Sequence, residues 1–294
     1  MGRNRRIDLC LSTKSAKIGE ENQMKIKPKV MKAITRTIIE GLETNGTWVK
    51  SWACGLPQNY ITKKAYRGMN LLLTSMKGYD SPYWLSMKQV NTKGGKVKKG
   101  ERATWILTPL IQKRKDKDGK EQTFLYGFGA CKIWNIEQTT LEVPENVERE
   151  IKPITRCVEI VEGYENSPVI IHEGVQACYN PSTDEVGMPK PQTFPNEEKY
   201  YKTLFHELSH STGHKKRLDR ELKGKYDKVS YSFEELVAEM GSLFLCAEAG
   251  IDMNTKNSQA YINGWITYLK NNEEAIIKAS SKAQKSCDLI VGGE

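Results

Sequence analysis

The segment 204–210, which reads Leu-Phe-His-Glu-Leu-Ser-His, constrains the fold of this chain more than any other stretch. Its histidines, His206 and His210, are four residues apart, so on a helix they lie one turn apart on the same face and can hold one ion. Glu207 stands beside the first histidine, where a carboxylate can take a proton from a water that the ion activates. The spacing therefore predicts a helical divalent-metal site suited to amide hydrolysis. The alternative is a surface helix whose histidines bind nothing.

A third ligand is needed, because a catalytic zinc site uses three protein ligands and keeps a fourth position open. His214 lies eight residues after His206, but the intervening Thr212-Gly213 should end the helix before it. We therefore interpret His214 as a residue close to the ligands and not as a ligand. Either His214 or a tyrosine such as Tyr231 is a candidate for steadying the oxyanion of a reacting amide.

A carboxylate from the next helix is the better candidate for the third ligand. The segment 232–241 opens with Ser232 as a predicted N-cap, has Glu235 in a capping-box position and then becomes apolar. Glu235 and Glu239 are four residues apart and share one face of this helix, as the two histidines do on theirs. The residues alone leave Glu234, Glu235 and Glu239 as alternatives.

Periodicity predicts a mixed α+β fold. Apolar residues recur at helical spacing over residues 29–45, and Asn45-Gly46 supplies a stop, which predicts an amphipathic helix. A charged turn at 113–120 lies between two β-rich runs and predicts a hairpin. In the second half, short strands precede a long helix that opens near Asn196. The expected strands are 105–107, 124–128, 169–171, 177–181 and 185–189.

The charge distribution divides the chain in two. Residues 1–145 hold 27 Lys and Arg against 13 Asp and Glu, a balance of +14, whereas the remainder holds 18 against 23, a balance of −5. Segregation of this size indicates that the first half meets a polyanion, and nucleic acid is the leading candidate. We expect a flexible basic arm over 1–23, a nucleic-acid-binding domain over 24–145 and a metal-binding domain over 146–294.

Aromatic residues interleave with cations in the basic half, a combination that suits unpaired bases stacked on rings with phosphates near lysines. The segment 93–102 has the densest cations, and its glycines indicate a tight turn, which favours a phosphate-contacting hairpin. Any single one of these residues can equally be core or solvated surface, so only the set favours nucleic acid. The aromatic residues are Trp48, Trp52, Trp84, Trp105, Trp134, Tyr60, Tyr66, Tyr79, Tyr83 and Tyr126.

Membrane and secretory classes are disfavoured. No stretch approaches the roughly 20 consecutive apolar residues of a spanning helix, and the amino terminus leads into no long apolar signal region. The seven cysteines are odd in number and never spaced as Cys-x-x-Cys. We therefore expect a cytoplasmic protein with reduced thiols and no membrane partner.

The order of the two metal-site helices resembles the gluzincin metallopeptidases, in which a His-Glu-x-x-His helix is followed by a Glu-x-x-x-acid helix. This resemblance implies that Glu235 is the third ligand. It also implies that Glu239 occupies the position of the acid that orients a ligand histidine, although that acid is usually Asp. The implied cofactor is Zn²⁺, with another divalent metal such as Mn²⁺ as the alternative.

A second resemblance spans residues 30–290. Its motifs contain Trp48, Trp52, Asn59, Thr62, Tyr66, Arg67, Gly68, Asn70, Trp84, Gln89, Gly94, Gly95, Val97, Lys99, Gly100, Glu101, Trp134, Asn135 and Gln138, then Tyr179, Asn180, Pro181, Asp184, Met188, Pro189 and residues 206–218. These motifs resemble the ArdC-type antirestriction proteins of conjugative plasmids, mobile elements and phages. The resemblance implies an amino-terminal domain that binds single-stranded DNA, a zincin-like carboxyl-terminal domain and protection of incoming DNA from restriction.

Three hypotheses follow for function. The first is an antirestriction protein that binds single-stranded DNA, with double-stranded DNA as a further partner. The second is an active zinc metalloprotease that its basic domain directs to host restriction proteins or other DNA-bound proteins. The third is an interaction module with a structural metal. The predicted DNA-contacting residues are Trp48, Trp52, Tyr66, Arg67, Asn70, Trp84, Lys93, Lys96, Lys98, Lys99 and Arg102.

Overall fold

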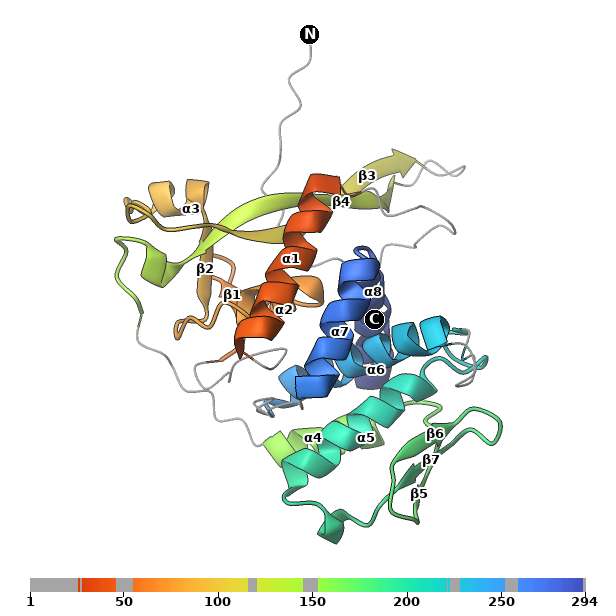
Figure 1. Cartoon of the computed structure of the whole chain (residues 1–294). Coiled ribbons are helices and arrows are strands. Elements are labelled where there is room, and N and C mark those ends of the chain that lie inside the picture. Colours follow the sequence, from red (N-terminus) through yellow and green to blue (C-terminus); the bar gives the residue numbers. More distant parts are fainter. Residues whose placement is uncertain are drawn as a thin grey trace.

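The computed structural model describes residues 26, 28–45, 55–115, 121–144, 153–220, 222, 228–251 and 259–292. Within them the chain has an α+β fold, as predicted, and its two sheets lie at opposite ends of a group of helices (Figure 1). Among the described residues, no helix is both long and apolar enough to cross a membrane. The described cysteines are free thiols.

The amino-terminal half builds a four-stranded sheet in the order β1-β2-β4-β3, in which β1 and β2 are parallel and the other pairs antiparallel. Strands β3 and β4 form the hairpin that the sequence predicts, and α1 coincides with the predicted amphipathic helix. The elements are α1 (Pro28–Asn45), β1 (Gln58–Asn59), α2 (Met69–Ser75), β2 (Tyr83–Ser86), α3 (Met87–Thr92), β3 (Thr104–Lys115), β4 (Glu121–Asn135) and a 3₁₀ turn, η1 (Ile136–Gln138).

The carboxyl-terminal half places a small sheet, in the order β5-β7-β6, beside a bundle of helices. The three predicted strands are present, and Asn196 caps the long helix that follows them by accepting a hydrogen bond from the Lys199 N–H. The elements are α4 (Pro153–Glu162), β5 (Val169–His172), β6 (Cys178–Asn180), β7 (Glu185–Met188), η2 (Pro191–Thr193), α5 (Glu197–Ser211), α6 (Lys228–Ala249), α7 (Gln259–Asn271) and α8 (Ala275–Val291).

Two local predictions were wrong. Helix α6 begins at Lys228, so Ser232 lies inside the helix and does not cap it. The basic segment 93–102 forms no hairpin with itself, since it follows α3 as a loop and bonds to the segment after β4. There the Lys98 N–H donates to the carbonyl of Gln138 at 2.9 Å, and the Thr140 N–H donates to the carbonyl of Lys96 at 2.9 Å. Such long-range pairing is invisible in local sequence patterns.

One hydrophobic core runs through both halves of the chain. It contains Ile34 and Ile38 of α1 and Leu72 of α2 together with Leu269 of α7 and Ile276 of α8, all of them almost fully buried. Figure 1 shows α7 and α8 lying between α1 and the helices α5 and α6. The two domains are therefore packed against each other through apolar side chains.

Gly241 lets helices α5 and α6 approach closely. A Cβ atom at this position would lie 2.5 Å from Ser209 Oγ and 2.9 Å from Ser209 Cβ, distances that side chains do not tolerate without movement. Because the residue is glycine, the two helices pack with their backbones in near contact. This packing brings the acidic face of α6 to the histidine face of α5.

Candidate metal centre

The two helices bring together the two histidines of the motif and Glu235, the third ligand that the resemblance to the gluzincins implies. His206 Nε2 and His210 Nε2 lie 3.2 Å apart. Carboxylate oxygens of Glu235 lie 3.5 Å from His206 Nε2 and 3.4 Å from His210 Nε2. The spacing of four residues on α5 and the close packing of α6 thus produce a cluster of two imidazoles and one carboxylate, all within 4.8 Å of one another.

The donor set and its dimensions fit a divalent metal. Zinc binds imidazole nitrogen and carboxylate oxygen at about 2.0–2.2 Å. In a tetrahedral shell of that radius, neighbouring donors lie roughly 3.3 Å apart, close to the separations of 3.2, 3.4 and 3.5 Å found here. Two imidazoles and one carboxylate leave a fourth position for water or substrate, the composition of a catalytic rather than a structural site.

Glu239 lies behind His206, the place that the resemblance to the gluzincins implies for it. Its carboxylate lies 3.6 Å from His206 Nδ1, on the side of the ring away from the Nε2 cluster. Burial lowers the pKa of His206, but hydrogen bonds to Glu235 and Glu239 outweigh it and raise the pKa to about 10. Such a carboxylate fixes the ring orientation and makes the ligand nitrogen a better donor to a metal.

Glu234 plays the corresponding part for His210, and local sequence patterns do not reveal this. Its carboxylate lies 3.6 Å from His210 Nδ1 and is gripped by Arg220 through Nε at 3.1 Å and Nη2 at 2.6 Å. Burial raises the pKa of Glu234, but hydrogen bonds from His210 and Arg220 outweigh it and lower the pKa. Glu234, one of the three alternatives for the third ligand, therefore lies behind a ligand and not beside the metal position.

Arg220 is a buried junction of three helices. Besides Glu234 on α6, its Nη2 donates to the carbonyl of Ser209 on α5 at 2.9 Å. Its Nη1 donates to Thr212 Oγ1 at 2.7 Å and to Ser286 Oγ of α8 at 3.0 Å. The five N–H donors of the guanidinium thus all have acceptors. The only hint in the sequence is an arginine shortly after the histidine motif.

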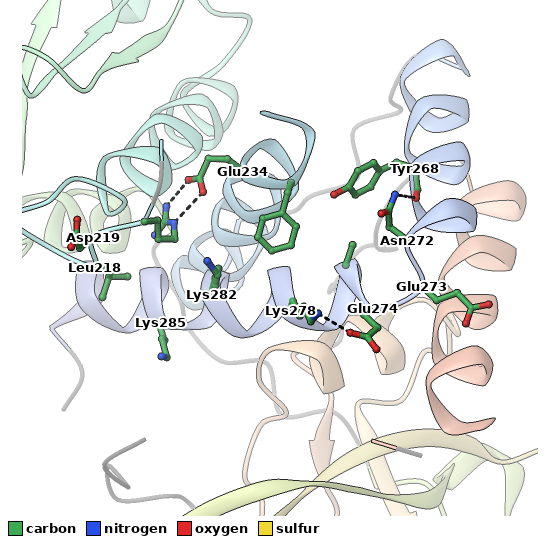
Figure 2. Close-up of a pocket in the computed structure, with 13 residues that line it drawn as sticks. Leu218, Asp219, Glu234, Tyr268, Asn272, Glu273, Glu274, Lys278, Lys282 and Lys285 are labelled. Atoms are coloured by element: carbon green, nitrogen blue, oxygen red, sulfur yellow. Dashed lines mark hydrogen bonds and ion pairs between the residues drawn. The ribbon is translucent and has the colours of Figure 1, made fainter. Parts of the chain in front are cut away.

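A cavity of about 850 Å³ adjoins this junction (Figure 2). Figure 2 shows Glu234 on one side of the cavity and Tyr268 and Asn272 on the other, with lysines along α8. Glu234 thus lines the cavity and also lies next to Nδ1 of His210. The remaining lining residues are Leu218, Asp219, Arg220, Phe233, Glu273, Glu274, Ala275, Lys278, Lys282 and Lys285.

His214 does not join the three-residue cluster. It is buried in the turn that follows α5, and its Nδ1 lies 3.9 Å from a carboxylate oxygen of Asp184. Asp184 is held by Arg217 in two hydrogen bonds, at 2.8 and 3.1 Å, and by Tyr179 Oη at 3.0 Å. These contacts join the small sheet to the end of α5, so His214 belongs to a structural network. The side chain of Tyr231 lies outside the described residues.

A further acidic side chain of helix α5 is Glu207, for which the sequence predicts the role of proton acceptor. It is adjacent to His206 on α5, is buried and does not belong to the three-ligand cluster. A metal held by that cluster would polarise a substrate carbonyl and acidify a coordinated water. In such a site the Glu207 carboxylate would be the group able to take up and hold a proton.

The predicted aromatic contacts to DNA need correction. Trp84 and Tyr66 are 1% and 5% exposed and form a core cluster with Ile106 and Ile133, so their rings offer no face to a base. Asn70 uses its side-chain amide to bond both backbone groups of Leu107, at 2.8 Å each. All three residues hold the fold of the amino-terminal domain together.

Arg67, too, binds side chains of the protein itself. It forms ion pairs with Asp288 of α8 and Glu248 of α6, at 2.5 and 3.8 Å, and joins the two domains at the surface. Trp48 and Trp52 lie outside the described residues. The predicted cations of the 93–102 loop are all exposed: Lys93, Lys96, Lys98, Lys99 and Arg102.

Comparisons with known proteins agree with this arrangement. Residues 28–152 match the family model described as the N-terminal domain of anti-restriction factor ArdC. Residues 163–282 match the model described as a zincin-like metallopeptidase. The second match contains the histidine helix, the acidic helix and Arg220.

Relatives match along most of this chain. Two DNA primases TraC of Escherichia coli are 30% and 29% identical over 92% and 93% of it. The chain spans only 28% and 20% of the length of those two proteins. The protein y4eC of Sinorhizobium fredii is 30% identical over 88% of this chain and 90% of its own length.

Two solved structures share the fold. The metal-free antirestriction protein ArdC of plasmid R388 is 32% identical, with a TM-score of 0.67 over 89% of this chain and 96% of that one. Its Mn(II)-bound structure is 29% identical, with a TM-score of 0.66 over the same shares. Together with the ligand geometry, the Mn(II)-bound relative indicates a divalent-metal site here. With both domains matched in order and nearly end to end, this chain belongs to the ArdC family of antirestriction proteins.

Proposed function

We propose that this chain is an antirestriction factor of a mobile element that binds single-stranded DNA through its amino-terminal domain and shields incoming DNA from host restriction. The observation that carries the proposal is the exposed run of cations between α3 and β3, in the domain that matches the amino-terminal domain of ArdC. The name of the solved relative, an antirestriction protein, supports the biological role. We assign the activity to the cytoplasm, where entering DNA meets restriction enzymes.

The backbone of the cationic loop is held firmly while its cationic side chains are exposed, and one of them, Lys98, also donates from Nζ to the carbonyl of Glu137 at 2.8 Å. Lys96 is fixed through its N–H, which donates to Thr140 Oγ1 at 2.9 Å, and Lys98 through its N–H to the carbonyl of Gln138. Gly95 packs so tightly on Leu141 that an added Cβ would lie 2.6 Å from that side chain. A fixed loop that presents lysines outward can follow a row of phosphates without a large ordering cost.

The first test removes the charges. Replacing Lys96, Lys98 and Lys99 together by Gln should weaken binding of an oligo(dT) strand and make its salt dependence shallower, by about 0.7 in log–log slope for each phosphate that a lysine no longer neutralises. Protection of DNA transferred into a restricting recipient should fall with it. The matched control replaces three lysines of α8 that line the cavity, Lys278, Lys282 and Lys285, by Gln. An equal effect of the control variant would overturn the proposal, because only net charge would then matter.

We further propose that the metal is zinc, with Mn²⁺ accepted in its place, held by His206, His210 and Glu235. The second candidate function is a metalloprotease that cuts host restriction proteins or other DNA-bound proteins. The buried Glu207, which directly follows His206 on α5, favours it. Glu207→Gln should leave the fold and metal binding intact while removing the proton acceptor.

If the Glu207→Gln variant still protects transferred DNA, proteolysis is not the means of protection. If protection is lost while metal content and DNA binding stay unchanged, the protease hypothesis replaces the DNA shield. Glu198→Gln, an exposed carboxylate earlier on α5, is the matched control.

A further inference from the structure

A tight turn at residues 59–64 carries a ring, that of Tyr60, and a cation, Lys63, at the surface of the amino-terminal domain. Lys63 has a φ of 55°, a left-handed backbone conformation that a non-glycine residue adopts only when its surroundings enforce it. The Lys63 N–H donates to the carbonyl of Asn59, and the Asn59 N–H donates to the carbonyl of Lys64, both at 2.9 Å. The place from which the Lys63 side chain leaves the backbone is thereby fixed.

That place is beside two tyrosines. Lys63 Nζ lies 4.4 Å from the ring centroid of Tyr60 and 4.1 Å from that of Tyr83. The two rings meet edge to face, with centroids 5.6 Å apart at an angle of 76°. Both tyrosines are half-buried and Lys63 is exposed, so the ammonium can move aside and leave ring surface open.

A polar frame fixes the position of these rings. Asn59 and Gln89 exchange two side-chain hydrogen bonds at 3.3 Å, which ties the turn to the start of α3. The Tyr60 N–H donates to the carbonyl of Trp84 at 2.9 Å, which ties the turn to β2. Tyr83 precedes Trp84 on the same strand and therefore points to the opposite face of the sheet, away from the buried Trp84 cluster.

The ring pair and the cationic loop rest on one hydrophobic cluster. Tyr60 and Tyr83 pack against the cluster of Leu85, Val90 and Ile136, and so does Leu141. Leu141 in turn lies under Gly95 of the cationic loop. Rings suited to stacking and cations suited to phosphates are therefore neighbours on the same small framework.

We infer that Tyr60, Tyr83 and Lys63 form a base-binding site for unpaired DNA: a base stacks on the tyrosine pair while the Lys63 ammonium moves from the rings to a flanking phosphate. This inference rests on the proposed binding of single-stranded DNA and adds the site at which a base is bound. Stacking on aromatic rings tolerates any base, which suits a protein that must meet arbitrary incoming sequences. The rings that stack on bases are thus those of Tyr60 and Tyr83. The rings of Trp84 and Tyr66, which the sequence suggests for this role, are buried.

The test compares a labelled oligo(dT) strand with an abasic strand of equal length, which keeps every phosphate and lacks the bases, by fluorescence anisotropy with the full chain. The wild-type protein should bind the oligo(dT) strand about tenfold more tightly. Tyr60→Ala and Tyr83→Ala should remove most of this preference and leave the affinity for the abasic strand unchanged. Tyr60→Phe and Tyr83→Phe should keep it, since they keep the ring. Tyr268→Ala, a half-buried tyrosine on α7, is the control and should keep it too.

The outcomes separate the inference from the proposed function. If neither strand binds the wild-type chain, the proposed DNA binding fails and the base site falls with it. If both strands bind and both alanine variants still prefer oligo(dT) tenfold, only the base site is overturned. A strand carrying 5-bromodeoxyuridine gives a check that needs no variant, because ultraviolet crosslinks in the wild-type protein should map to Tyr60 or Tyr83. Crosslinks found only elsewhere would overturn the site as well.

Discussion

Among single residues, Glu234 makes a contact in the metal centre that local sequence patterns do not reveal. Its carboxylate is 3.6 Å from His210 Nδ1 and is itself fixed by Arg220. Substitution of a residue that orients a metal ligand typically lowers metal affinity 10–100-fold. Glu234→Gln should therefore weaken divalent-metal binding by about that factor, as measured by competition with a chromophoric chelator.

Two comparisons make the Glu234→Gln result specific. Glu198→Gln should leave metal affinity unchanged, since Glu198 is exposed and lies far from the ligand turn along α5. The absorption spectrum of the Co²⁺-loaded protein should also change in Glu234→Gln, because the ligand geometry changes. An unaltered spectrum and affinity would mean that the contact behind His210 does not orient it.

The protonation of His206 predicts how metal binding depends on pH. Burial lowers the pKa of His206, but hydrogen bonds to Glu235 and Glu239 raise it from 6.5 to about 10 in the metal-free protein. A metal binds only the neutral ring, so binding near neutral pH must release a proton, and affinity should rise as pH increases toward 10. Calorimetry in buffers of different ionisation enthalpy measures this release; binding without proton release would contradict the prediction.

The raised pKa of His206 affects the stability of the metal-free chain in the opposite direction to metal binding. Because the pKa of His206 is higher in the folded than in the unfolded protein, the protonated ring stabilises the fold. That stabilisation is fully present below pH 6.5 and is lost as the pH rises through about 10. Metal binding and metal-free stability should thus change in opposite directions over this range.

At the scale of elements, the packing of α5 on α6 depends on Gly241. A methyl group at this position would collide with Ser209, whose hydroxyl is bonded to the carbonyl of Phe205 at 2.7 Å and cannot easily move. Gly241→Ala should lower the free energy of unfolding by about 1–3 kcal/mol and weaken metal binding, because the helices must separate. Gly264→Ala on α7 is the matched control.

An added Cβ at Gly264 meets nothing within 4 Å, and alanine favours the helix, so Gly264→Ala should be neutral or stabilising. Denaturant unfolding of the two variants side by side measures the difference. Equal stability of Gly241→Ala and Gly264→Ala would show that helix contact at Ser209 is not limiting.

Helices with a clear pattern could be predicted from the sequence, whereas the side of the sheet to which a strand residue points could not. Helix α1 follows from apolar spacing and a stop signal at Asn45-Gly46, which are local signals. Trp84 and Tyr83 are neighbours on one strand, and nothing local indicates which of them faces the core. Likewise, the role of Arg220 depends on acceptors from three helices that come together only in the fold.

At the scale of the whole molecule, the two domains are distinct in charge but continuous in packing. Residues 1–145 carry a balance of +14 and the rest −5, yet α1 and α2 share a core with α7 and α8. Arg67 adds ion pairs to α6 and α8 across the same boundary, although exposed pairs of this kind contribute only about 0–1 kcal/mol each. Apolar contact therefore dominates the coupling of the domains.

Such coupling predicts that the chain unfolds as one cooperative unit. Separating the domains would expose Ile34, Ile38, Leu269 and Ile276, which are now fully buried, at a cost of roughly 1.5–3 kcal/mol for each side chain. Scanning calorimetry should therefore give a single transition, and divalent metal should raise the temperature of that whole transition, since it binds only the folded state. Glu235→Ala should abolish the metal-induced rise and keep the single transition. Two transitions, with only one raised by metal, would mean that the domains unfold independently and that the shared core does not couple them.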